Sequence, residues 1–159
     1  MRPKCRRLLC RYRETDFIID DESYFTLSNT SLAGNDRFYS DNLQKIPKNV
    51  MYKSVQKYEP KLLVWLAISP QGVTKPFIAN SGLAINQTRY LEIIKQYLEP
   101  FILKNYPHGG YVFWPDLASS HYAKSVQDYL KSKNIDFIAK NDNPANVTKV
   151  RPIEDFLET

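Results

Sequence analysis

The chain has 159 residues, and its 22 Lys and Arg against 17 Asp and Glu make the formal net charge at pH 7 +5. Apolar residues are 43% of the chain, which is enough for one folded domain and excludes a wholly disordered or collagen-like protein. Two cysteines are too few for a disulfide scaffold, and no apolar run approaches the roughly 20 residues that span a bilayer. The basic start lacks the apolar stretch of a signal peptide, so we expect an intracellular, reducing setting.

The positive charge is concentrated at the N-terminus. Residues 1–13 carry a charge of +6 and no acid, whereas the rest of the chain has sixteen bases, seventeen acids and a charge of −1. The six bases are Arg2, Lys4, Arg6, Arg7, Arg11 and Arg13. This segment is either an arm or linker that contacts phosphate, or a solvated and frayed terminus, and the sequence leaves both open.

The first half of the chain predicts β-structure. Apolar, β-branched and aromatic residues from 16 onward predict a strand that continues through DDES into YFTL, and the apolar run 61–69 predicts a strand buried on both faces. Residues 73–80 predict a hairpin partner or an edge strand, because they contain Pro76. Between these strands we expect a turn at 29–36, a short strand at 37–40 and an irregular loop at 41–60.

The second half alternates helices and strands. The longest helix follows a capping Asn86, and Pro100 should kink or tighten its last turns. Its apolar stripe is Tyr90, Ile93, Ile94, Tyr97, Leu98, Phe101 and Ile102. After it we expect a strand at 111–114, a helix capped by Ser119 or Ser120 with Ala123, Val126, Tyr129 and Leu130 inward, a short strand at 136–139 and a final helix from Pro152. This order predicts an α/β protein with a mixed sheet.

Acidic residues stand at three points where such sheets form active sites. Asp20, Asp21 and Glu22 follow an apolar strand segment, Asp116 follows the strand 111–114, and Glu154 opens the last helix. Carboxylates from separate elements are what a pair of Mg²⁺ ions requires, and such a pair can cleave phosphodiesters. Each acid alone is equally well explained as a turn or helix-cap residue.

Four blocks, in order over about residues 16–157, resemble the catalytic domain of mariner-type DNA transposases. Their first block resembles DDESYF, followed here by Gly34, Phe38 and Tyr39. The strand-turn-strand after it resembles KLLVWLAISPQGVTKPFI, and the second catalytic block resembles WPDLASSHYAKSVQDYL. The third block resembles RPIEDF, preceded by the loop NDNPANVTKV.

The resemblance implies a ribonuclease-H-like fold, a mixed sheet flanked by helices, over residues 14–159. It implies that Asp21, Asp116 and Glu154, the last two separated by 37 residues, hold two Mg²⁺ or Mn²⁺ ions. The implied reaction is DNA cleavage at transposon ends, after which the 3′-hydroxyl attacks target DNA. The implied partner is double-stranded DNA and no membrane, with a homodimer as one assembly and the nucleus as location.

Asp20 is a rival to Asp21 for the first metal ligand. Alternation along a strand places the two side chains on opposite faces, so only one can face the metals. The family's block reads Asp-Glu, which favours Asp21. For DNA contact, the candidates are Arg6, Arg7, Arg11, Arg13 and His121, although a capping or packing role for His121 is the simpler explanation.

The sequence also departs from the family's pattern. The 159 residues do not contain the family's paired helix-turn-helix modules, and we expect residues 1–13 to take the place of the linker after them. Leu157 stands where the family has Trp, and the last helix is short, so we expect a C-terminally truncated copy. An inactive remnant that binds DNA or protein is therefore the alternative function, with a general ribonuclease-H-like nuclease as a third. Neither a Ser-His hydrolytic triad nor a zinc site fits the spacing of the Ser, His and Cys residues.

Overall fold

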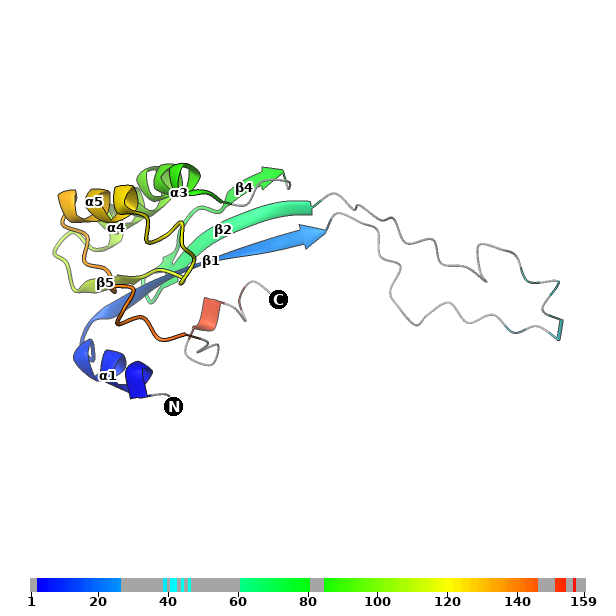
Figure 1. Ribbon diagram of the computed structural model, residues 1–159, viewed down its shortest axis with the longest axis horizontal. Helices are drawn as coiled ribbons and strands as arrows, with labels where there is room; N and C mark the ends of the chain where they lie inside the picture. Colours follow the sequence, from blue (N-terminus) through cyan, green and yellow to red (C-terminus); the bar gives the residue numbers. More distant parts are fainter. Residues whose placement is uncertain are drawn as a thin grey trace.

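The computed structural model describes residues 3–26, 39, 41, 42, 44, 46, 61–80, 85–145, 151–153 and 156. These residues form a five-stranded mixed sheet with helices on both faces (Figure 1). The strands are β1 (Asp16–Thr26), β2 (Lys61–Ser69), β3 (Gly72–Val73), β4 (Phe77–Asn80) and β5 (Tyr111–Trp114). The helices are α1 (Pro3–Arg11), α3 (Gln87–Ile93), the π-helix η2 (Ile94–Leu98), α4 (Glu99–Asn105) and α5 (Lys124–Ser132).

The sheet has the order β3-β2-β1-β5, and β4 also pairs with β2. β1 is antiparallel to β2 and parallel to β5, with Ile19 opposite Trp114 at the end of the parallel ladder. A parallel pair needs a long crossover, and α3, η2 and α4 lie within the segment that makes it. The expectation of a mixed α/β sheet is confirmed. The parallel register also brings the residues after Ile19 and after Trp114 to the same end of the β1–β5 ladder.

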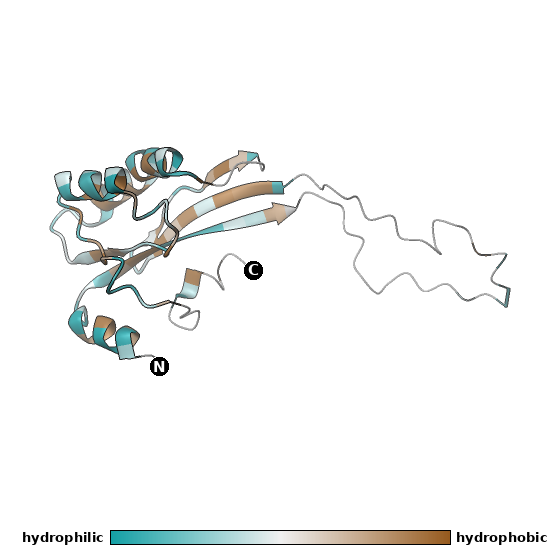
Figure 2. Ribbon diagram, in the orientation of Figure 1, coloured by the Kyte–Doolittle hydropathy of each residue, from teal (hydrophilic) through white to brown (hydrophobic). Residues whose placement is uncertain are grey.

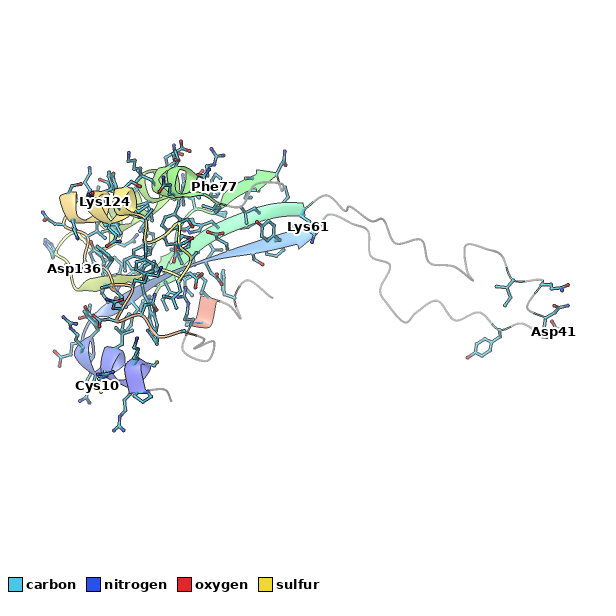
Figure 3. The ribbon with its side chains drawn as sticks, in the orientation of Figure 1. Cys10, Asp41, Lys61, Phe77, Lys124 and Asp136 are labelled. Atoms are coloured by element: carbon cyan, nitrogen blue, oxygen red, sulfur yellow. The ribbon has the colours of Figure 1, made fainter. Side chains whose placement is uncertain are left out.

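Two hydrophobic clusters cover the two faces of the sheet. One joins Ile18, Trp65 and Phe113 to the buried side chains of α3, η2, α4 and α5. The other joins Ile19 and Trp114 to Leu8, Ile138 and Ile153. Lys124 at the start of α5 and Cys10 on α1 accordingly lie on opposite sides of the sheet (Figure 3). The apolar colour along β2 in Figure 2 marks the strand predicted to be buried on both faces.

Most expected elements are present, with differences that have local causes. The strand at 61–69 is confirmed. The segment expected at 73–80 contains the second residue of β3 and all of β4, separated by residues 74–76, which include the proline. The long helix is confirmed and stays helical through Glu99–Asn105. Its π-turn, Ile94–Leu98, ends two residues before Pro100, which has no N–H to complete the regular ladder.

Two expectations were wrong. The helix expected after Ser119 or Ser120 begins only at Lys124, and its N-cap is Ala123, which makes no side-chain cap. Main-chain turns precede it, including a bond from the His121 N–H to the Ala118 carbonyl, so the serines cannot cap it. Residues 136–139 form a single bridge between Phe137 and Phe113 rather than a strand. The expected elements at 29–36 and 37–40, and most of 41–60, lie outside the described residues.

The N-terminal segment forms a helix that packs on the sheet. Cys5 and Leu8 of α1 are buried, while its bases are exposed. These two buried residues, one helical turn apart, pack α1 against the sheet. The alternative of a frayed terminus therefore does not hold for Pro3–Arg11. The division of the chain at residue 13 stays a prediction. Among the described residues, no helix has the length and apolar character to cross a membrane.

Candidate active site

Asp20 is fully buried in the middle of β1 and accepts hydrogen bonds from three distant groups. Its Oδ2 accepts from Nε1 of Trp65 at 3.1 Å and from the hydroxyl of Tyr90 at 2.6 Å. Its Oδ1 accepts from the main-chain N–H of Asp116 at 3.0 Å. Both oxygens are thus occupied by buried donors, and the side chain lies on the sheet face that α3 covers.

Asp21 lies on the opposite face of β1 and is partly exposed. Its Oδ1 accepts a 2.8 Å hydrogen bond from the main-chain N–H of Glu22. Burial and, less strongly, the carboxylates of Asp116 and Asp20 raise the pKa of Asp21 to about 6, against the opposing effects of that N–H and of Arg151. A carboxylate held near other carboxylates in a partly buried place favours a bound cation.

Asp116 follows β5 at the same edge of the sheet. It lies two residues beyond the last pair of the parallel ladder, Ile19 and Trp114, and its charge is close enough to Asp21 to raise the pKa of that carboxyl. Its main chain is held by Asp20, but its side chain is 48% exposed. The structure therefore brings Asp21 and Asp116 near each other, where β5 ends beside the middle of β1, and their carboxylates form an oxygen-rich surface there.

Arg151 is a buried cation at this edge, with its side chain only 7% exposed. Its Nη2 donates to the main-chain carbonyl of Asp20 at 2.5 Å, and its Nη1 donates to the carbonyl of Pro115 at 3.4 Å. Nη1 also lies 3.9 Å from Oδ1 of Asp116, and the guanidinium carbon lies 5.8 Å from the ring centre of Trp114. One side chain thus contacts the middle of β1 and the residue directly after β5, next to both acids.

Asn143 holds the same loop from a third direction. Its Nδ2 donates to the Pro115 carbonyl at 2.8 Å and to the hydroxyl of Tyr122 at 2.7 Å. Its Oδ1 accepts from Nε1 of Trp114 at 2.8 Å. The peptide group between Pro115 and Asp116 is therefore held at its carbonyl and at its N–H, while the Asp116 carboxylate stays partly exposed for a ligand.

The His121 ring pairs with the carboxylate of Glu22 and stacks on the ring of Tyr90. Its Nε2 is 2.9 Å from Oε1 of Glu22, and the two rings are 3.7 Å apart at 12°. Burial opposes the charged form, but the bond to Glu22 and the nearby carboxylates outweigh burial, so the pKa of His121 is raised. With its side chain 1% exposed, His121 has the packing role rather than a surface position suited to phosphate contact.

The third predicted ligand, Glu154, lies outside the described residues. The described residues contain no group of three His, Cys, Asp or Glu side chains placed to share a metal ion. The donors that are described, Asp21 and Asp116, fit a hard divalent cation, because both are carboxylates and Mg²⁺ retains several waters. Arg151 and the buried Ile153 place the start of the segment that leads to Glu154 at this edge.

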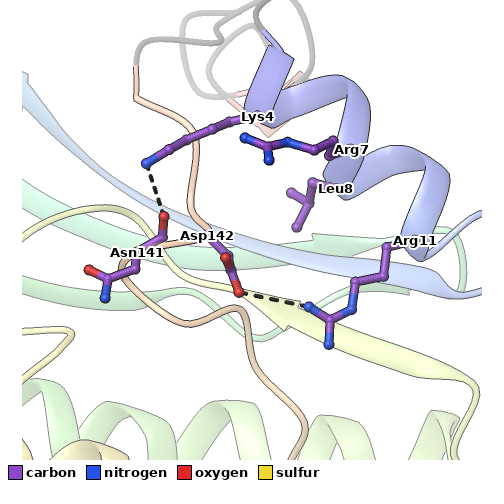
Figure 4. A pocket seen from close by; sticks show the side chains of 6 residues that line it. All are labelled: Lys4, Arg7, Leu8, Arg11, Asn141 and Asp142. Carbon is purple, nitrogen blue, oxygen red and sulfur yellow. Dashed lines mark hydrogen bonds and ion pairs between the residues drawn. The ribbon is translucent and has the colours of Figure 1, made fainter.

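A basic surface lies on the α1 side of the sheet. Lys4, Arg7 and Arg11 line a pocket of about 380 Å³ together with Leu8, Asn141 and Asp142 (Figure 4). Lys4 donates to the Asn141 carbonyl at 3.0 Å, and Arg11 is 3.7 Å from Asp142. Three cations against one carboxylate leave this surface positive.

Sequence reasoning missed Arg151 and Asn143 as parts of the site. Both lie in or beside the Asn-Pro loop and the RPIE block, but neither residue type signals a buried role on its own. The available signal was position: Arg151 stands three residues before a predicted ligand.

Comparison with solved structures identifies the fold. The chain is similar to the Mos1 transposase in a paired-end complex with the left transposon end, with a TM-score of 0.69 and 18% identity over 98% of this chain and 45% of that one. It is similar to the catalytic domain of Mos1 mariner transposase, with a TM-score of 0.62 and 20% identity over 98% and 64%. A third structure, the Mos1 catalytic domain with Raltegravir and Mg, has a TM-score of 0.63 and 19% identity over 98% and 65%.

The chain thus spans less than half the length of the Mos1 transposase chain in the paired-end complex. No protein-family model and no curated protein matches the sequence. The predicted ribonuclease-H-like architecture is confirmed by the match over nearly the whole chain. The chain has the fold of the mariner transposase catalytic domain.

Proposed function

We propose that the chain is a DNA transposase catalytic domain, which cleaves DNA at transposon ends and joins the 3′-hydroxyl to target DNA in the nucleus. Asp21, Asp116 and Glu154 would hold two Mg²⁺ or Mn²⁺ ions. When bound, such ions polarise phosphate and activate the attacking oxygen. The observation that carries the proposal is that Asp21, in the middle of β1, and Asp116, directly after the neighbouring β5, lie close together in this fold.

The surroundings of the two acids support this role. Asp20 and Asn143 hold the main chain around Asp116, so its carboxylate keeps one place while remaining exposed. Preorganised ligands of this kind are what metal-dependent phosphodiester cleavage requires. Among the similar structures, a Mos1 paired-end complex was solved with Mn and a Mos1 catalytic domain with Mg.

The DNA partner is supported by the basic face of α1. Its exposed bases include Arg6, Arg7 and Arg11, and Arg13 follows the helix. Fixed cations on a seated helix can neutralise phosphates without ordering a mobile tail first. The basic face of α1 would bind the phosphates of the DNA duplex, because residues 14–159 are nearly neutral.

A nicking assay tests the proposed activity. Supercoiled plasmid is incubated with the 159-residue chain in Mn²⁺ or Mg²⁺, and the Asp116→Asn variant is compared with it. We expect metal-dependent nicking that is lost in Asp116→Asn and retained in Asp128→Asn, an exposed position on α5. Equal cleavage by the wild type and Asp116→Asn would remove the assigned site.

Metal binding separates the enzyme from an inactive remnant. Calorimetric titration with Mn²⁺ should show binding that Asp21→Ala and Asp116→Ala abolish. DNA binding without Mn²⁺ binding would instead support the remnant that acts as a binding module. Preferential cleavage of RNA–DNA hybrids would support the general nuclease.

A further inference from the structure

Arg151 joins the middle of β1, which carries Asp21, to the segment after β5, which carries Asp116. Its two terminal nitrogens donate to main-chain carbonyls of Asp20 and Pro115, each directly before one of those acids. The residues Asp20 and Pro115 are far apart in sequence, and the ladder between β1 and β5 has ended at Ile19 and Trp114. Arg151 therefore links the strands where their own hydrogen bonds stop.

We propose that Arg151 is the positioning residue of the carboxylate pair, which fixes the spacing of Asp21 and Asp116 for the metal ions. This inference rests on the proposed function. A guanidinium suits the task because its planar fork reaches two acceptors at a fixed separation. A lysine ammonium is a single point of charge, so it cannot hold both carbonyls in the same geometry.

The Arg151 side chain is buried, so its contacts belong to the folded interior and are not a surface ion pair. A buried charge is tolerated only when it is paired and hydrogen-bonded. Asp116 at 3.9 Å supplies the opposite charge, the two carbonyls accept hydrogen bonds, and the Trp114 ring lies 5.8 Å away. The guanidinium is therefore fixed by hydrogen bonds, an opposite charge and a ring contact. A group must itself be fixed in this way if it is to position the two carboxylates.

The charge of Arg151 and its geometry predict opposite effects on metal affinity. As a cation beside two carboxylates, it would compete with a metal, so loss of its charge alone would tighten binding. As a positioning group, it keeps the carboxylates at the separation a metal needs, so loss of its fork would weaken binding. Arg151→Lys keeps the charge and loses the fork, whereas Arg151→Gln loses both.

The test measures Mn²⁺ affinity by calorimetry and amide hydrogen exchange in the same variants. We expect Mn²⁺ binding to weaken about tenfold or more in both Arg151→Lys and Arg151→Gln, the range found when groups that orient metal ligands are removed. We also expect faster exchange of the Asp116 amide without metal, while amides of β2 keep their rates. Arg89→Lys, at an exposed Arg89–Glu92 ion pair, is the matched control.

The outcomes separate this inference from the proposed function. Tighter Mn²⁺ binding in Arg151→Gln with unchanged binding in Arg151→Lys would overturn it in favour of simple charge competition. A lower melting temperature with unchanged Mn²⁺ affinity and Asp116 exchange would reduce Arg151 to a stabilising residue. If the wild type binds no Mn²⁺, the proposed function fails, and an unchanged Asp116 exchange rate in Arg151→Lys overturns the positioning role. Should Arg151→Gln fail to fold, Arg151→Lys decides alone.

Discussion

The main-chain N–H of Asp116 donates a 3.0 Å hydrogen bond to Oδ1 of Asp20, and this bond assigns different roles to two adjacent acids. Asp20 uses its oxygens to hold Asp116, Trp65 and Tyr90 in the core. Asp21, on the other face of β1, is left with an accessible carboxylate beside that of Asp116. The geometry therefore favours Asp21 as the metal ligand and makes Asp20 its structural neighbour.

Replacement of Asp20 should affect folding first. Asp20→Ala leaves two buried side-chain donors and one main-chain donor without an acceptor, so we expect the free energy of unfolding to fall by about 2–4 kcal/mol. Asp20→Asn keeps one acceptor oxygen and should lose less. Urea denaturation measures both, with Asp128→Asn as the exposed control. A stable Asp20→Ala protein that no longer binds Mn²⁺ would show that Asp20 is the ligand instead.

The raised pKa of Asp21 predicts how stability depends on pH in the absence of metal. The folded pKa of about 6 exceeds the unfolded value of 3.8, so the folded state binds more protons between these pH values. Stability should therefore fall as pH rises from about 4 to about 6 and stay lower above that range.

Asp21→Asn has no carboxyl group to titrate, so this fall in stability with rising pH should not occur in the variant. In EDTA at pH 7.5 we expect the variant to be more stable than the wild type by about 1–2 kcal/mol, a value reduced from the full linkage because Asp21 is partly solvated. Urea melts across pH 4–8 measure the difference, which should vanish near pH 4. A constant difference over this range would show that charge on Asp21 is not its cause.

The pair of His121 and Glu22 predicts a dependence of the same sign in a higher pH range. Because the pKa of His121 is raised in the folded state, its stabilisation is fully present below the unfolded pKa and is lost as pH rises through the folded value. Glu22→Gln should destabilise the protein by about 1 kcal/mol at pH 5.5 and by less at pH 8.5. NMR titration of the His121 ring should show its pKa lowered in Glu22→Gln; an unchanged pKa would show that this pair does not raise it.

The basic face of α1 predicts a change in salt dependence. The triple replacement Arg6→Gln, Arg7→Gln and Arg11→Gln should weaken duplex binding and reduce the slope of log affinity against log salt by about 3, if each contacts a phosphate. Fluorescence anisotropy at several salt concentrations measures both effects. An unchanged slope would place the DNA elsewhere.

Leu8→Ala is the matched control for this helix. Leu8 is 4% exposed, so its loss should lower the free energy of unfolding by about 2–3 kcal/mol while leaving the salt slope of the folded protein intact. Deletion of the residues 1–13 would combine both effects, because it removes buried apolar contacts together with the charges.

Local patterns predicted many elements because periodicity and turn chemistry act within a few residues. The stripe from Tyr90 to Ile102 and the apolar run Lys61–Ser69 read directly as helix and strand. The predicted N-cap of α5 was wrong, because main-chain turns occupy Ala118–Ala123 and the helix begins only after them. The predicted strand at 136–139 is a single β-bridge in the structure, because within it only Phe137 pairs with Phe113.

The sequence by itself determined the order of the blocks, the mixed α/β class and the choice of Asp21 and Asp116 as candidates. Only the tertiary structure decided that the Asp20 side chain is buried and hydrogen-bonded in the core, that α1 packs on the sheet and that Arg151 links β1 to the segment after β5. Each of these depends on groups brought together from distant parts of the chain, such as Arg151 and Asp20, which are 131 residues apart. Periodicity specifies which face a residue occupies, but its partners there come from the folding of the whole chain.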